Sequence, residues 1–166
     1  ELPPGRQNIK TVALRNNRRD ELIEKIKQIS NEGRQIYWVC TLIEESEALR
    51  AESAENTFNY LSSNLEGIKV VMIHGRLTKS EKEEIMNDFV EGRINLLVAT
   101  TVIEVGVNVP NASLMIVENA ERLGLAQLHQ LRGRVGRGAE KSACVLMYQS
   151  PLSESAKQRL DILRQS

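Results

Sequence analysis

No excess of either charge is present in this sequence: 22 lysines and arginines are balanced by 22 aspartates and glutamates. A bulk electrostatic field will therefore not draw the domain onto nucleic acid, and any contact with phosphates has to be local and shaped. No apolar run approaches the length of a membrane span, and no signal-peptide pattern is present. We expect a cytoplasmic protein that does not associate with membranes.

Cysteine is scarce as well. The two cysteines, Cys40 and Cys144, both lie in apolar, strand-like runs. Their spacing matches neither a disulfide framework nor a metal site. We therefore expect two buried thiols in a reducing compartment and no set of metal ligands in this chain.

Also missing is the Gly-x-x-x-x-Gly-Lys-[Ser/Thr] loop with which many nucleotide-binding proteins hold phosphates and Mg²⁺. No paired acidic motif for a metal ion and water follows a predicted strand either. The sequence therefore contains no phosphate cradle of its own.

What is present is an alternation of short apolar runs and amphipathic helices. The 166 residues, 41% of them hydrophobic, are enough for one soluble domain with a real core. Continuous apolar strands joined by helices predict a parallel sheet covered on both faces, which is a three-layer α/β domain. The predicted strands are residues 10–14, 35–40, 69–73, 95–99, 114–117 and 143–148, and the predicted helices are 17–33, 44–65, 78–92, 123–131 and a stretch from 153.

The predicted helices have recognisable ends and apolar faces. Asn17 is predicted to cap the first helix, and Thr78 with Glu81 forms a capping box that opens the third. Gly92 is predicted to end that third helix. The expected inward-facing residues are Leu22, Ile23, Ile26 and Ile29 in the first helix, Ala51, Ala54, Phe58 and Leu61 in the second, and Ile85, Met86, Phe89 and Val90 in the third.

Polar or glycine-bearing residues follow four predicted strands, at the edge where open α/β sheets bind ligands. Hydroxyls and N–H groups at such turns bind phosphates well, although threonines also end strands for structural reasons alone. A histidine before a glycine is more often a turn residue than a catalyst, and we interpret His74 in this way. The four groups are Thr41, His74-Gly75-Arg76, Thr100-Thr101 and Glu118-Asn119.

The segment Gln-Leu-Arg-Gly-Arg-Val-Gly-Arg at 130–137 is the most informative in the chain. It places Arg132, Arg134 and Arg137 within six residues, separated by Gly133 and Gly136. Arginine keeps its charge near neutral pH, and its planar guanidinium matches the phosphate oxygens on which charge must be stabilised in phosphoryl transfer. A solvated basic turn is the alternative interpretation.

Two longer segments carry a family resemblance. Residues 100–112 (TTVIEVGVNVPNA) and 124–138 (GLAQLHQLRGRVGRG) resemble the second RecA-like lobe of superfamily 2 helicases of the RecG family. The resemblance covers essentially the whole chain, including the lead-in at 2–5 and the segment 38–46. The segment 124–138 is shared with transcription-repair coupling factor.

This resemblance implies a division of the chain and a missing partner lobe. It implies a linker from a preceding lobe at 1–9, a RecA-like lobe without a Walker A loop at 10–150, and the truncated start of a following helical region at 151–166. Both ends are then cut from a longer protein. ATP and Mg²⁺ are expected to be bound mainly by the first RecA-like lobe of the same protein.

The resemblance also implies roles for individual residues. Arg134 and Arg137 match the sixth helicase motif, whose arginines contact ATP phosphates, and we expect Arg137 to act as the arginine finger. Gln130 opens that motif and is expected to order it. Gly106 and Asn108 fall in the fifth motif, next to the nucleotide. The residues expected to contact the DNA backbone are Thr41, Gly75, Arg76, Thr100 and Thr101.

One residue departs from the family pattern. The resemblance implies an aspartate at the position where this chain has Asn108. An amide keeps a hydrogen-bond acceptor but loses the negative charge, so a contact with a motif arginine would be weaker than a salt bridge.

The implied activity is that of an ATP-dependent helicase acting on branched or forked DNA. Fork regression, branch migration, recombination and DNA repair are the expected processes, and we expect a monomer whose isolated second lobe is inactive. One alternative is the same lobe of a transcription-repair coupling factor, whose partner would be RNA polymerase. The other is a non-catalytic α/β scaffold module in which the arginines merely bind phosphate.

Overall fold

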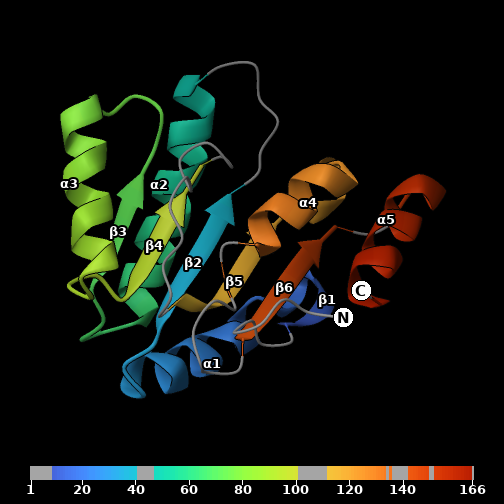
Figure 1. The fold of residues 1–166 in the computed structure, drawn as a ribbon, viewed down its shortest axis with the longest axis horizontal. Helices are drawn as coiled ribbons and strands as arrows, with labels where there is room; N and C mark the ends of the chain where they lie inside the picture. Colours follow the sequence, from blue (N-terminus) through green and yellow to red (C-terminus); the bar gives the residue numbers. More distant parts are fainter. Residues whose placement is uncertain are drawn as a thin grey trace.

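A computed structural model describes residues 9–40, 47–100, 112–133, 135, 142–149 and 152–165. Within them, six strands form one sheet in the order β1-β6-β5-β2-β4-β3, with all neighbours parallel (Figure 1). The strands are β1 (Ile9–Arg15), β2 (Gln35–Cys40), β3 (Val70–Ile73), β4 (Leu96–Ala99), β5 (Ala112–Glu118) and β6 (Ser142–Tyr148). The helices are α1 (Asp20–Asn31), α2 (Glu47–Asn64), α3 (Lys79–Val90), α4 (Leu125–Arg132) and α5 (Glu154–Gln165), with 3-10 turns η1 (Asn16–Arg18) and η2 (Ala120–Arg122).

Side chains of each strand alternate between two apolar cores, one on either face of the sheet. In the central strand β2, Tyr37 and Val39 belong to one core, and Ile36, Trp38 and Cys40 belong to the other. Helices α3, α4 and α5 contribute to the first core, and α1 and α2 contribute to the second. All six residues of β2 are buried, as expected for a parallel sheet covered on both faces. The three-layer α/β prediction is confirmed.

Helix α1 begins later than the sequence predicts. Asn17 does not cap it, because residues 16–18 form the turn η1, in which the Arg19 N–H donates to the Asn16 carbonyl (3.1 Å). Arg19 occupies the N-cap position without a side-chain cap, and the helix starts at Asp20. The prediction of its apolar stripe is confirmed, since Leu22, Ile23, Ile26 and Ile29 are all buried.

Helix α2 presents one polar residue to the core. Ala54 and Leu61 are completely buried, as predicted, but Phe58 is only partly buried. Thr57 is buried instead (5% exposed), which places a hydroxyl on the inward face of the helix. The side chain of Ala51 lies outside the described part of the chain.

Helix α3 has the predicted start and end. The Glu81 N–H donates to the Thr78 hydroxyl (3.1 Å), and the Thr78 N–H donates to the Glu81 carboxylate (2.9 Å). Gly92 follows the helix with a φ of +83°, a left-handed conformation that suits glycine. Phe89 is buried, but the prediction for Val90 is wrong: it is 43% exposed, because the next residue along a helix is rotated by about 100° away from the core.

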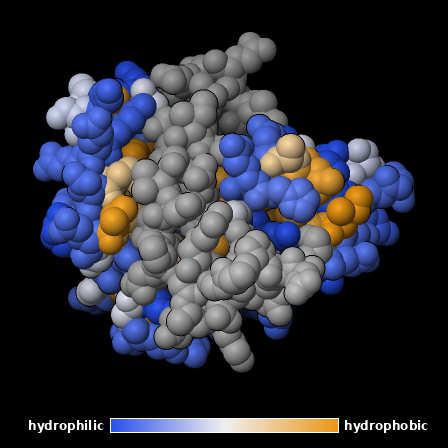
Figure 2. Space-filling view, viewed as in Figure 1, coloured by the Kyte–Doolittle hydropathy of each residue, from blue (hydrophilic) through white to orange (hydrophobic). Residues whose placement is uncertain are grey.

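Helix α5 packs against the same face as α4. The Ser153 hydroxyl accepts from the Ala156 N–H (3.0 Å) at its start, and Leu160 and Leu163 enter the first core. In the view of Figure 2 the described surface is largely hydrophilic, interrupted by small apolar areas. The large apolar side chains most exposed among the described residues are Val90 and Ile162.

Candidate functional site

The carboxyl ends of the strands meet along one edge of the sheet. Glu118 at the end of β5 is in register with Cys40 at the end of β2, and Ile73 at the end of β3 is in register with Ala99 at the end of β4. The polar residues that follow these strands therefore share one edge, as the sequence predicts.

Part of the predicted DNA-contacting set can be placed at this edge. Gly75 and Arg76 lie in the turn between β3 and α3, where Arg76 is exposed. His74 stabilises this turn, because its Nδ1 accepts a hydrogen bond from the Arg76 N–H (3.2 Å). Thr100 follows β4 and is buried (4% exposed). The predictions for Thr41 and Thr101 fall outside the described residues.

Of the predicted nucleotide-contacting set, the structure describes Gln130. It lies on α4, and its side chain faces solvent, which leaves it accessible to a ligand. Val135, inside the same motif, is completely buried in the core. The predictions for Arg134, Arg137, Gly106 and Asn108 concern residues outside the described ranges.

Arg132, the first arginine of the motif, is directed into the protein. Its guanidinium donates to the carbonyl of Leu163 near the end of α5 (3.0 Å) and to the hydroxyl of Thr11 in β1 (3.4 Å). A positive charge is favourable at the C-terminal end of a helix, where carbonyl groups lack helical partners. Arg132 therefore connects α4 with α5 and β1.

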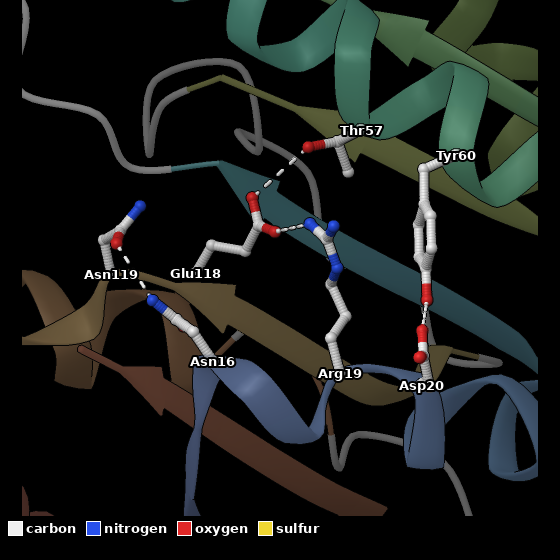
Figure 3. A network of polar contacts seen from close by, with 7 residues as sticks. All are labelled: Asn16, Arg19, Asp20, Thr57, Tyr60, Glu118 and Asn119. Atoms are coloured by element: carbon white, nitrogen blue, oxygen red, sulfur yellow. Dashed lines mark hydrogen bonds and ion pairs between the residues drawn. The ribbon is translucent and has the colours of Figure 1, made fainter. Parts of the chain in front are cut away.

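The structure adds a polar network that sequence reasoning did not identify (Figure 3). The Glu118 carboxylate accepts from the Arg19 guanidinium (3.1 Å) and from the Thr57 hydroxyl (3.4 Å). Next to it, the Asn16 amide donates to the Asn119 side-chain oxygen (3.4 Å). The sequence predicts Glu118 and Asn119 as polar residues after a strand, but no sequence pattern indicates which residues contact them.

A second contact fixes the position of Arg19. Its guanidinium lies over the Tyr60 ring, 4.2 Å from the centroid, a geometry that favours a cation. The Tyr60 hydroxyl donates to the Asp20 carboxylate. Burial raises the pKa of Tyr60 above its ordinary value, and Asp20 raises it further.

A polar cavity and one buried thiol lie beside the network. A cavity of about 460 Å³ opens beside it, lined by Asn16, Asn17, Arg19, Asn56, Thr57, Glu118, Asn119 and Met147. Burial raises the pKa of the nearby Cys40 thiol well above its ordinary value, and the charge of Glu118 adds to this effect. Cys144 is likewise free, with its pKa raised by burial to about 12, so the prediction of two buried thiols is confirmed.

Asn119 has the backbone conformation that turns the chain out of β5. Its φ of 52° and ψ of 44° are left-handed, a region that asparagine tolerates better than most residues. The chain then enters η2, where the Arg122 N–H donates to the Asn119 carbonyl (3.0 Å). This turn directs the chain toward α4.

The described residues contain neither a cluster of metal ligands nor a helix that could span a membrane. No group of three or more His, Cys, Asp or Glu residues is placed to hold a metal ion among them. None of the helices in these ranges combines the length and apolar character needed to cross a membrane.

Comparison with known proteins identifies the domain. The family model for the helicase conserved C-terminal domain matches residues 17–139. The ATP-dependent DNA helicase RecG of Escherichia coli (strain K12) is 59% identical over 100% of this chain, and that of Bacillus subtilis (strain 168) is 43% identical over the same share. The chain covers 24% of the length of each of these relatives, or about a quarter.

Solved structures agree. RecG bound to a three-way DNA junction superimposes with a TM-score of 0.82 and 43% identity, covering 99% of this chain and 21% of that one. The yeast DEAD-box splicing factor Prp28 shares the fold, with a TM-score of 0.74 at 18% identity over 96% of this chain and 33% of its own. The fold is the RecA-like lobe of helicases, and the chain belongs to the helicase conserved C-terminal domain family.

Proposed function

We propose that this chain is the second motor lobe of a RecG-type, ATP-dependent helicase of branched DNA. The observation that carries the proposal is the 59% identity with RecG over the full length of the chain. The TM-score of 0.82 to a RecG bound to a three-way DNA junction supports it. Fork regression and branch migration, in DNA recombination and repair, are the processes proposed for the whole protein, with the cytoplasm as its location.

The carboxyl edge of the sheet is the proposed contact with the DNA backbone. Arg76 is exposed in a turn that His74 and the capping box at Thr78 hold in place, so its cationic side chain is available there. Contacts of this kind bind phosphates rather than base edges, which suits recognition of a branched shape. The full proposed set is Thr41, Gly75, Arg76, Thr100 and Thr101.

The sixth motif is the proposed contact with the nucleotide. Arg134 and Arg137 would face the phosphates from across the cleft between two lobes, with Gln130 ordering their segment and Gly106 and Asn108 beside them. The exposure of Gln130 on α4 is compatible with a ligand there. ATP and Mg²⁺ would be held mainly by the first lobe. Hydrolysis of the bound ATP would supply the free energy that drives the motor.

The test is Arg137→Ala in the full-length protein, with ATP turnover measured on branched DNA. An arginine finger contributes on the order of 10³–10⁵-fold, so turnover should collapse while DNA affinity stays near that of the wild type. Arg164→Ala is a matched control, because Arg164 is an exposed arginine paired with Asp161 on α5. Turnover that is the same in Arg137→Ala and wild type would refute the assignment.

A further inference from the structure

We propose that Glu118 is a positioning residue that couples DNA contact to ATP turnover, by connecting the end of β5 with helices α1 and α2. This inference rests on the proposed function. It assigns a role to a carboxylate that belongs to neither the nucleotide-contacting nor the DNA-contacting set.

Glu118 lies between one segment of the proposed DNA set and one segment of the proposed nucleotide set. It is in register with Cys40, the last residue of β2 and the neighbour of Thr41 in the sequence. Beyond Glu118 the chain continues through η2 into α4, which carries Gln130 and leads to the motif arginines. A shift of the end of β5 relative to β2 would therefore alter the spacing between the proposed DNA and nucleotide contacts.

The carboxylate uses both oxygens to connect different elements. Oε1 accepts from Arg19, at the start of α1, and Oε2 accepts from Thr57, in α2 (Figure 3). The side chain of Glu118 is only 11% exposed. Since α1 and α2 both cover the same face of the sheet, Glu118 joins that helical layer to the end of β5.

The cavity of about 460 Å³ beside this connection has a largely polar lining. Among the described residues that line it, Met147 is the one apolar side chain. Elsewhere the layers are held by close-packed side chains, which resist displacement. At this edge the polar contacts of Glu118 hold α1 and α2 against the end of β5.

The same network contains a contact that can be removed without touching Glu118. Tyr60 of α2 bonds Asp20 of α1 through its hydroxyl, and its ring supports Arg19. Tyr60→Phe keeps the ring and loses the hydroxyl, so it weakens the α1–α2 contact and leaves the end of β5 in place. It is the matched control for a purely structural effect.

The experiment uses the full-length protein with Glu118→Gln, Thr57→Val and Tyr60→Phe. ATP turnover is measured without DNA and with saturating branched DNA, and the thermal unfolding midpoint is measured for each variant. The ratio of DNA-stimulated to DNA-free turnover should fall by about 2- to 30-fold in Glu118→Gln, the range typical for residues on coupling networks. Thr57→Val should lower it less, and Tyr60→Phe should leave it at the wild-type value.

The outcomes are distinct. A ratio that is unchanged in Glu118→Gln and Thr57→Val, or that falls equally in Tyr60→Phe, would overturn the inference and leave a structural role. If Glu118→Gln does not fold, the comparison of Thr57→Val with Tyr60→Phe decides in the same way. A wild-type protein that branched DNA does not stimulate would overturn the proposed function, and this inference with it.

Discussion

At the scale of single residues, the three arginines of the sixth motif are not equivalent. Arg132 donates to a helix carbonyl and a threonine hydroxyl inside the protein. It is therefore part of the lobe's own structure, and phosphate contact is proposed for Arg134 and Arg137. Of three arginines within six residues, one can thus have a structural role while the others are proposed to contact phosphate. Residue type alone does not distinguish these roles.

Arg76 offers a second test at this scale. Arg76→Ala should weaken binding of branched DNA by a similar factor for every sequence, and should reduce the slope of log affinity against log salt by roughly 0.7–0.9, because one phosphate contact is lost. Fluorescence anisotropy titrations over a series of salt concentrations measure this. Arg93→Ala is the control, since Arg93 is exposed before β4, at the opposite edge, and pairs with Asp88. An unchanged slope in Arg76→Ala would contradict the proposed phosphate contact.

At the scale of elements, local signals predicted structure well. The bounds of β2 and the capping box of α3 are those that the sequence predicts, because a continuous apolar run and a Thr-x-x-Glu pattern act over a few residues. The predicted start of α1 at Asn17 is wrong, because residues 16–18 form the turn η1 and Asn17 cannot cap the helix from within it.

The polar network could not be predicted in this way. Arg19 and Thr57 lie 99 and 61 residues from Glu118 in the sequence, so their contacts depend on how the layers assemble. The burial of Thr57 is especially hard to predict, because a threonine within a helical sequence is expected to be exposed to solvent. The candidate site was predicted where it follows strand ends, and missed where distant elements converge.

The capping box provides the element-scale prediction. Thr78→Ala removes the hydroxyl that accepts from Glu81, and should lower the free energy of unfolding by about 1 kcal/mol. Urea denaturation followed by circular dichroism measures this change. Ser80→Ala, an exposed position two residues later, is the control, and should be neutral or slightly stabilising because alanine favours helices. Equal stabilities of Thr78→Ala and wild type would show that the cap contributes nothing.

At the scale of the whole molecule, the proposed function makes this lobe one part of a two-lobe motor. The chain covers about a quarter of its RecG relatives and has no Walker A loop. Under the proposed function, the motif arginines therefore act on phosphates that another lobe presents.

The isolated chain should accordingly fold but not hydrolyse ATP. Phosphate release from the purified lobe, with and without branched DNA, should stay at the level of buffer, while circular dichroism shows a cooperative unfolding transition. The full-length protein, assayed in parallel, is the positive control. Robust turnover by the lobe alone would mean that it contains a complete active site, contrary to the proposed division of labour.

The pairing of β1 has a consequence for how such a lobe is made. β1 is an outermost strand of the sheet, and it pairs with β6 from Ile9 beside Ser142 to Arg15 beside Tyr148. Among the described strands, β1 is synthesised first and its sheet partner β6 last, so β1 stays unpaired until the rest have been made. Long-range parallel pairing is slow to form, and an unpaired strand edge invites aggregation. The lobe must therefore complete its sheet late and as a unit. Nascent chains that stop before β6 are then the species most prone to aggregation.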